Sequence, residues 1–445
     1  MNVVISIFVV FFTLIFSVYK GIFVGYPLLL GFFVFVYISL RKGFLLKDII
    51  KMSISGIKKA FIVLKIFILI GAITGVWMAS GTVPAIIYYG ILHMNPHFFI
   101  LYTFLISCMV SFLLGTSFGT ISTVGLALML IAKTGNINVN LAAGAIMSGT
   151  YFGDRCSPMS SSANLVANLT QTDLYINIKN MFKTSIIPFI LSVIIYFILS
   201  LKAPLHIIDS KMHNEIINVF QINWIVLLPA IIILVFALFK IDVKISMLVS
   251  IAVASIIAIF IQYYKPIEVL NFIFLGFHLD KSSSLQNILK GGGILSMLKS
   301  FVVVFISCSL AGIFDGTNML SNIENILMKA KTRYDLLVYT TITSIITAAF
   351  GCNQSISTVL TNQLMKKSYL DKNIDKYQFA IDLENTGIVL SPLIPWNIAV
   401  LVPATIMGVD SIGFIPYSFY LYLIPIINIV LLKYNNKYAF SDASS

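Results

Sequence analysis

Long apolar runs are the feature that most constrains the fold of this chain. A run of about 18 residues or more can cross the hydrocarbon core of a bilayer as a helix. Such runs cover residues 2–19, 21–40, 60–79, 97–114, 184–201, 222–239, 243–262 and 412–432. Shorter runs interrupted by Gly, Pro and Ser lie near 82–92, 119–132, 139–152, 301–314, 336–350 and 393–408. Hydrophobic residues make up 59% of the 445 and charged residues only 10%, too few to cover a water-soluble surface. We therefore predict an all-α polytopic membrane protein with roughly 10–13 transmembrane segments, some of them broken.

The connection after the second run predicts the orientation of the chain. A basic stretch from Arg41 to Lys59 joins two apolar runs. The positive-inside rule places such a connection in the cytoplasm, and the N-terminus with it. Apolar residues recur at helical spacing between Leu45 and Ile57, which predicts an amphipathic helix on the inner leaflet of the plasma membrane. The net charge of +12 lies in short loops, so it indicates a membrane surface and no nucleic-acid partner.

Residues 153–168, GDRCSPMSSSANLVAN, place charged and hydroxyl side chains among these apolar runs. A carboxylate at membrane depth costs roughly 2.5–3.5 kcal/mol, so Asp154 predicts a function such as cation binding. Gly153 and Pro158 oppose a regular helix and leave backbone carbonyls free. The alternative is a helix–loop boundary, with hydroxyls that cap helix ends and with Asp154 paired to Arg155.

Oxygen ligands around this break suit Na⁺, which prefers hard donors. The side chains predicted to bind the ion or a substrate in this segment are Asp154, Ser157, Ser160 and Asn164, and Na⁺ itself is assigned to Asp154, Ser157 and Asn164.

Residues 383–397, LENTGIVLSPLIPWN, form a counterpart in the second half of the chain. Glu384 is the second candidate carboxylate, and protons and Na⁺ could compete for one oxygen cluster that it shares with Asp154. An interfacial position near the Lys-rich loop 366–376 is the alternative for Glu384. The predicted binding residues here are Glu384, Asn385, Ser391 and Asn397, with Pro392 and Pro395 breaking the helix.

The two halves share an unusual order of motifs. GTSFGT at 115–120 and FGCNQS at 350–355 are each followed, about 40 residues later, by a Ser-Pro step and an Asn. This order predicts a distant duplication that gives two inverted repeats, which meet at broken or hairpin helices. The alternative is a chance resemblance between the two short motifs. Supporting residues are Gly115, Thr116, Ser117, Gly119, Asn353 and Gln354. The predicted organisation is an N-terminal helix pair with the amphipathic segment (1–59), a first transport repeat (60–201), linking helices (202–293) and a second repeat (294–445).

Four blocks together resemble the NhaC sodium/proton antiporter family of the ion transporter superfamily. They are GVWMASGTVPAIIYYG (75–90), GTSFGTISTVGLAL (115–128), GAIMSGTYFGDRCSPMSSSAN (144–164) and LENTGIVLSPLIPWN. The resemblance implies a Na⁺-coupled secondary transporter that uses Na⁺ and H⁺ as coupling ions and has no cofactor. The chain departs from the family pattern at Ser161 and Asn385, where acidic residues are usual. Each departure removes one negative charge from the predicted site.

Because of these departures, the sequence does not decide between Na⁺/H⁺ exchange and the transport of a second kind of substrate. Neutral Ser and Asn could still bind Na⁺ or a substrate carboxylate, so a Na⁺-coupled carrier of a small organic solute is the alternative, for an amino acid or for carboxylate exchange such as malate for lactate. No HExxH pair or nucleophile elbow is present, and the chain is therefore not expected to be an enzyme. The expected partners are membrane lipids, small ions and a small solute, and a homodimer stays open.

Overall fold

The computed structural model describes residues 22–93, 95–204, 217–239, 243–279, 291–317 and 332–434, together with 9–10, 12–14, 16–17, 20, 241 and 330. Much of the first apolar run, and parts 205–216 and 280–290 of the predicted linking region, lie outside the described residues. The described part is helical and holds no β-strand; one isolated bridge joins Phe277 and Gly291. The predicted all-α fold is confirmed.

Helices of the first part of the chain run up to Lys202. They are α2 (Gly25–Arg41), α3 (Leu46–Ala79), α4 (Thr82–His93), η1 (Pro96–Phe98), α5 (Phe99–Leu114), α6 (Ser117–Thr120), the π-helical turn η2 (Ile121–Gly125), α7 (Leu126–Thr134), α8 (Val139–Cys156), α9 (Ser161–Thr170) and α10 (Leu174–Lys202).

The remaining helices follow the linking region. They are η3 (Trp224–Leu227), α12 (Leu228–Leu238), α13 (Val243–Phe260), α14 (Pro266–Leu275), η5 (Ile294–Met297), α15 (Leu298–Thr317), α17 (Arg333–Gly351), α18 (Gln354–Leu370), α19 (Lys376–Leu383), the π-helical turn η6 (Glu384–Ile388), η7 (Ser391–Leu393), α20 (Ile398–Met407), η8 (Ile415–Tyr417) and α21 (Phe419–Tyr434).

Several helices are long and apolar enough to cross a membrane. Among the described residues there are four, or up to five if the bent pair Lys376–Leu393 and Ile398–Met407, which meet at 50°, forms one broken span. The four are Pro96–Leu114, Leu174–Lys202, Ile294–Phe314 and Arg333–Gly351. Shorter apolar helices of 10–17 residues accompany them. The outer face of α10 exposes large apolar side chains such as Ile187, Ile190 and Ile194, as a lipid-facing helix should. The protein is therefore a multi-pass membrane protein.

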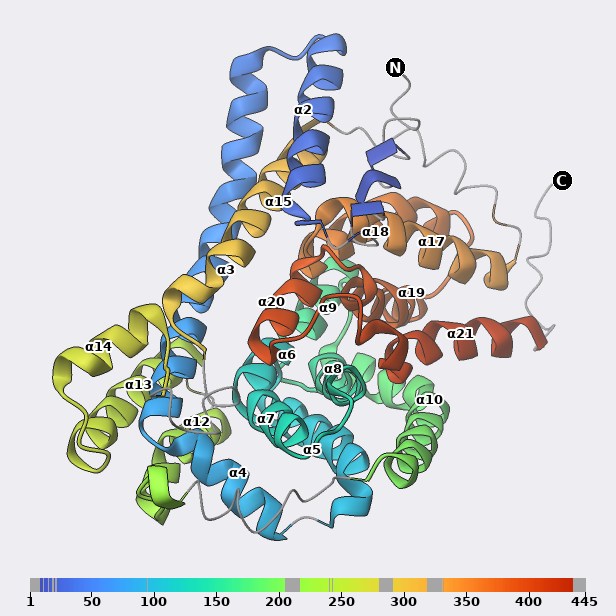
Figure 1. Ribbon diagram of the computed structural model, residues 1–445. Coiled ribbons are helices and arrows are strands. Elements are labelled where there is room, and N and C mark those ends of the chain that lie inside the picture. The colour runs from blue at the N-terminus through green and yellow to red at the C-terminus, as the bar shows by residue number, and fades with distance from the viewer. Residues whose placement is uncertain are drawn as a thin grey trace, which may run out of the picture.

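One side of the molecule is built around the long helix α3, which lies beside α15 and near α2, with α12, α13 and α14 at its lower end (Figure 1). Small residues allow this close approach: a Cβ on Gly56 would lie 2.0 Å from the carbonyl oxygen of Cys308, and one on Gly312 would lie 2.3 Å from that of Met52. The predicted amphipathic segment forms the first turns of α3 instead of a separate helix.

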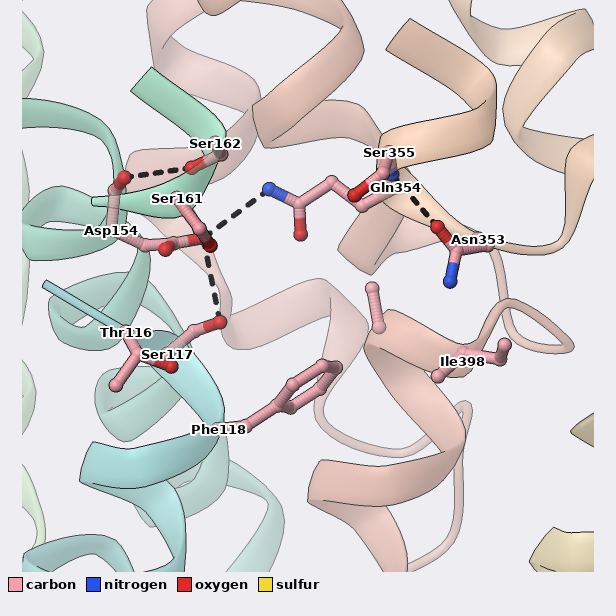
Figure 2. A pocket seen from close by; sticks show the side chains of 11 residues that line it. Thr116, Ser117, Phe118, Asp154, Ser161, Ser162, Asn353, Gln354, Ser355 and Ile398 are labelled. Atoms are coloured by element: carbon pink, nitrogen blue, oxygen red, sulfur yellow. Dashed lines mark hydrogen bonds between the residues drawn. The ribbon is translucent and has the colours of Figure 1, made fainter. Parts of the chain in front are cut away.

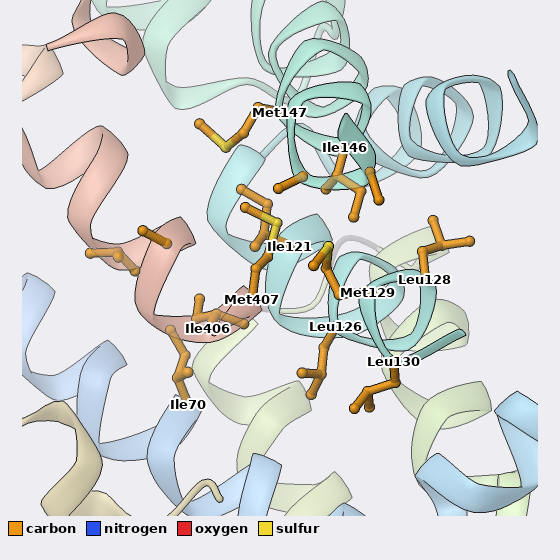
Figure 3. Packing of buried hydrophobic residues seen from close by; sticks show 14 of the residues in the cluster. Ile70, Ile121, Leu126, Leu128, Met129, Leu130, Ile146, Met147, Ile406 and Met407 are labelled. Atoms are coloured by element: carbon orange, nitrogen blue, oxygen red, sulfur yellow. The ribbon is translucent and has the colours of Figure 1, made fainter. Parts of the chain in front are cut away.

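The other side holds α5–α10 and α17–α21, with α8 at its centre (Figure 1). Nearly every residue of α8 is buried, although the helix carries Asp154 and Arg155 near its end. Apolar side chains of α7, α8 and α20, including Leu128, Ile146 and Met407, pack together (Figure 3). A helix that is apolar on all sides, as α7 is, belongs inside the protein. This rigid packing fixes where the end of α8 points.

Candidate functional site

Two helix breaks, one in each half, have nearly the same backbone conformation. Gly115 ends α5 in the left-handed region (φ 65°, ψ 26°), and Cys352 ends α17 there too (φ 48°, ψ 11°). The next residue is extended in both cases: Thr116 has φ −151° and ψ 128°, and Asn353 has φ −145° and ψ 133°. Each extended residue then caps the following helix, α6 or α18, with its side-chain oxygen. The paired motifs GTSFGT and FGCNQS therefore form the same local structure.

Close packing explains why Gly115 is needed at the first break. Its positive φ favours glycine, and a Cβ there would lie 2.6 Å from the backbone carbon of Met159. Gly153 is packed as tightly, since a Cβ would lie 2.2 Å from the amide nitrogen of Phe112. These contacts bring the break after α8 against the break after α5.

A small polar cavity of about 80 Å³ lies where segments of the two halves meet (Figure 2). Its lining comes from both halves of the chain and is rich in hydroxyl and amide groups. The lining residues are Thr116, Ser117, Phe118, Asp154, Ser161, Ser162, Asn353, Gln354, Ser355, Ile398 and Ala399. The space is large enough for an ion with a few water molecules.

Asp154 is the acidic residue of this cavity, and it is only 4% exposed. Its Oδ2 atom accepts hydrogen bonds from the Ser117 hydroxyl at 3.4 Å and from Nε2 of Gln354 at 3.2 Å (Figure 2). The Gln354 Oε1 atom accepts in turn from the Tyr151 hydroxyl at 3.4 Å. Ser162 donates to the backbone carbonyl of Asp154 at 2.9 Å. The carboxylate thus joins the end of α8 to the start of α18 across the two halves.

Helices begin at the cavity on several sides. Its lining includes residues of the first turns of α6, α9, α18 and α20, whose N-caps are Thr116, Ser160, Asn353 and Asn397. The N-terminal end of a helix carries a partial positive charge, which favours an anionic group nearby. The arrangement therefore stabilises an ionised Asp154 inside the protein and compensates part of the cost of burying it.

Arg155, the next residue of α8, makes a second link between the halves. It is fully buried and donates to the hydroxyl of Thr184 at 2.8 Å, and also to Ser185 and to the Oδ1 atom of Asn385. Among the described residues, no carboxylate forms an ion pair with Arg155. The alternative in which Asp154 pairs with its neighbour is thus not the arrangement in this structure.

Glu384 lies in the π-helical turn η6 and is fully buried inside the protein. Neither of its carboxylate oxygens has a hydrogen-bond partner among the described residues. Arg155 and Asp154 both interact with it electrostatically. π-helical turns are rare and frequently occur at functional sites. A buried carboxylate without donors has free coordination capacity for a cation or a proton.

The other predicted residues lie around these groups in different roles. Ser157 accepts from the amide of Met159, Ser160 caps α9, and Ser391 donates to the carbonyl of Gly387 at 2.7 Å. Asn397 caps α20 and is buried, whereas Asn164 is exposed and donates to the carbonyl of Ser160 at 2.7 Å. None of Ser157, Ser160, Asn164, Glu384, Asn385, Ser391 and Asn397 lines the cavity itself.

The prolines mark the breaks without reaching the cavity. Pro158 follows the last turn of α8, Pro392 lies in η7, and Pro395 lies in the turn before α20. They keep the two following helices separate, so that α9 and α20 can begin at the cavity.

Several residues that matter here are not apparent from the sequence. Tyr151, Ser162 and Ser355 had no signal beyond an ordinary polar side chain in a helix. Arg155 did have one, since it is charged and adjacent to Asp154. Ser161, one of the two positions where an acidic residue is usual in the resembling family, lines the cavity, and the other, Asn385, contacts Arg155.

Comparison with known proteins places the chain in a family. The model of the Na⁺/H⁺ antiporter family matches residues 149–435, which include both carboxylates and most of the residues that line the cavity. The chain belongs to the Na⁺/H⁺ antiporter family. The resemblance to NhaC proteins predicted from the motifs is confirmed, and the chain is a secondary transporter of this family.

Relatives of this chain are named for different transport activities. A Na⁺/H⁺ antiporter of Haemophilus influenzae, described as uncharacterized, is 29% identical over 400 residues, covering 87% of this chain and 84% of that protein. The malate-2H⁺/Na⁺-lactate antiporter of Bacillus subtilis is 29% identical over 411 residues, covering 90% and 87%. The Na⁺/H⁺ antiporter NhaC of Alkalihalophilus pseudofirmus is 28% identical over 404 residues, covering 88% and 85%. The matches extend over nearly the whole chain, well beyond the site.

Proposed function

We propose that this chain exchanges Na⁺ for H⁺ across the plasma membrane and that Asp154 binds both ions in turn. The observation that carries the proposal is the buried Asp154 carboxylate in an ion-sized cavity formed by both halves. A carboxylate that binds one cation at a time couples their movements, because release of one is needed before the other binds. The chain would act as a transporter and not as an enzyme.

Gln354 and Ser117 can adapt to the ion that is bound. Both now donate to Asp154, which suits an ionised carboxylate without a cation. When Na⁺ binds, rotation of the Gln354 amide presents its Oε1 atom to the ion and its Nε2 atom to the Tyr151 hydroxyl, which can also accept. Ser117 can likewise turn its lone pairs to the ion. The same groups thus serve the empty and the occupied site.

Access to the cavity from alternate sides would follow from motion of one half against the other. The Asp154–Gln354 hydrogen bond joins helices of different halves, so a relative movement would open the carboxylate to one side of the membrane. We also propose that the N-terminus is cytoplasmic, because Arg41, Lys42 and Lys47 lie at the connection between α2 and α3.

A second candidate is Na⁺-coupled movement of a small organic carboxylate. The four helix starts and the hydrogen-bond donors at the cavity favour an anionic group, which a substrate carboxylate would supply. Two relatives carry organic solutes in their names, the malate-2H⁺/Na⁺-lactate antiporter and the arginine/ornithine antiporter ArcD of Halobacterium salinarum. The helix starts favour this candidate, while the small volume of the cavity favours an ion.

Proteoliposomes with a pH-sensitive dye inside separate these candidates. An imposed Na⁺ gradient should move protons with no organic solute present if the chain is a Na⁺/H⁺ exchanger. A pH trace that stays flat until malate, lactate or an amino acid is added would favour the organic solute. A flat trace with all solutes, from protein that is folded, would contradict both.

A further inference from the structure

The buried charges around the end of α8 do not balance. Asp154 and Glu384 contribute two carboxylates, and Arg155 contributes one guanidinium. Within the described part of the chain no ion pair joins them, although Glu384 interacts electrostatically with both Arg155 and Asp154. With both carboxylates ionised, the cluster carries one net negative charge. A region of low dielectric favours electrical neutrality, so the charge of this cluster favours the binding of one further cation.

The surroundings of Arg155 keep its charge available to these carboxylates. Its hydrogen-bond partners are all neutral: the side chains of Thr184, Ser185, Asn385 and Cys156 and the backbone carbonyl of Met181. Its Nε atom has no partner among the described residues. Neutral partners hold the guanidinium in place and do not cancel its charge. Glu384 is fully buried, and no hydrogen-bond donor among the described residues stabilises the charge of its carboxylate.

We infer that Arg155 is a tethered cation: its guanidinium supplies one of the two positive charges that neutralise Asp154 and Glu384. It thereby limits the protein to one transported cation at a time. This inference rests on the proposed exchange function. Arg155 acts through the carboxylates and is a positioning residue, since it does not line the cavity. Asn385 is the residue that preserves this effect, because its neutral amide accepts from the guanidinium without pairing with its charge.

Asn385→Asp tests the inference directly. An Asp at this position would pair with Arg155, leave Asp154 and Glu384 uncompensated, and create a place for a second cation. The measurement is the thermal unfolding of the purified full-length chain in detergent, at alkaline pH and over a series of NaCl concentrations balanced with choline chloride. Binding to the folded state raises stability with a slope, against the logarithm of Na⁺ concentration, that reports the number of ions bound.

The expected slope corresponds to one Na⁺ for the unmodified chain and to two for Asn385→Asp. Asn223→Asp is the matched control, since it makes the same chemical change at the half-buried N-cap of η3, and its slope should stay at one. If Asn385→Asp does not fold, Arg155→Gln replaces it in the test. The slope should then correspond to two Na⁺ for Arg155→Gln and to one for Arg155→Lys. The inference is overturned if the slope is one for both Asn385→Asp and Arg155→Gln. It is also overturned if neither of these variants folds and Arg155→Lys gives a slope of two. A slope of zero in the unmodified chain would instead contradict the proposed function and, with it, the inference.

Discussion

Replacing Asp154 with Asn should abolish Na⁺-coupled transport while leaving the protein folded. The two side chains have nearly the same size, and the Asn Oδ1 atom can still accept from Ser117 and Gln354. Neutral hydrogen bonds contribute about 0.5–1.5 kcal/mol each, somewhat less than bonds to a charge. Removing a buried charge offsets that loss, because burial of an ion costs several kcal/mol. We therefore expect little change in thermal stability.

The effect on ion binding is much larger. A carboxylate and a cation 4 Å apart attract each other by about 4 kcal/mol at an effective dielectric constant of 20. Loss of this attraction weakens Na⁺ binding by about a thousand-fold. Transport driven by millimolar Na⁺ should then fall to the level of protein-free liposomes.

The assay is Na⁺-driven proton movement in proteoliposomes, measured beside the thermal unfolding of the same preparation. Asp173→Asn is the matched control: Asp173 caps α10 at an exposed position, and Asn caps helices equally well. Its transport and stability should both equal those of the unmodified chain. Full Na⁺-driven transport by Asp154→Asn would refute the assignment of Asp154 as the cation-binding carboxylate.

Three further changes probe the surroundings of the site. Gln354→Ala should raise the Na⁺ concentration for half-maximal transport by about 10- to 100-fold, since it removes the Oε1 atom proposed to bind the ion, and a polar contact with a charged group contributes about 1.5–3 kcal/mol; an unchanged concentration dependence would exclude Gln354 as a ligand. Glu384→Gln should impair transport at all Na⁺ concentrations because it removes a buried charge that interacts with Asp154, and normal initial rates would contradict this. Asp382→Asn should lower the free energy of unfolding by about 3–5 kcal/mol, because Asp382 forms a buried ion pair with Arg333 at 2.5 Å, and an unchanged melting temperature would argue against that estimate.

Much of the fold could be predicted because the signals for membrane helices and for helix breaks lie in short local stretches of sequence. Apolar runs of sufficient length predicted membrane helices, and Gly, Pro and Ser within them predicted the breaks. The motif around Asp154 was found because a carboxylate among apolar residues is costly wherever the helix packs. The separate amphipathic helix was predicted from periodicity alone, and tertiary packing instead joined that segment to α3, where Gly56 contacts α15.

Which residues line the cavity depends on contacts between helices that are distant in the sequence. Ser161 and Asn164 both belong to one hydroxyl- and amide-rich stretch, yet only Ser161 faces the cavity, because the first turn of α9 turns Asn164 outward. The rotation of a short helix about its own axis decides this, and packing against α18 and α19 sets that rotation.

The sequence by itself determined that this chain enters a membrane and that its helices are broken, because the free energy of placing a residue in a bilayer is set mainly by that residue. Only the tertiary structure decided that Gln354 reaches Asp154 from 200 positions away and that Arg155 rests against Asn385. Such pairs depend on the packing of whole helices, and a change of one turn in that packing would give Asp154 different ligands.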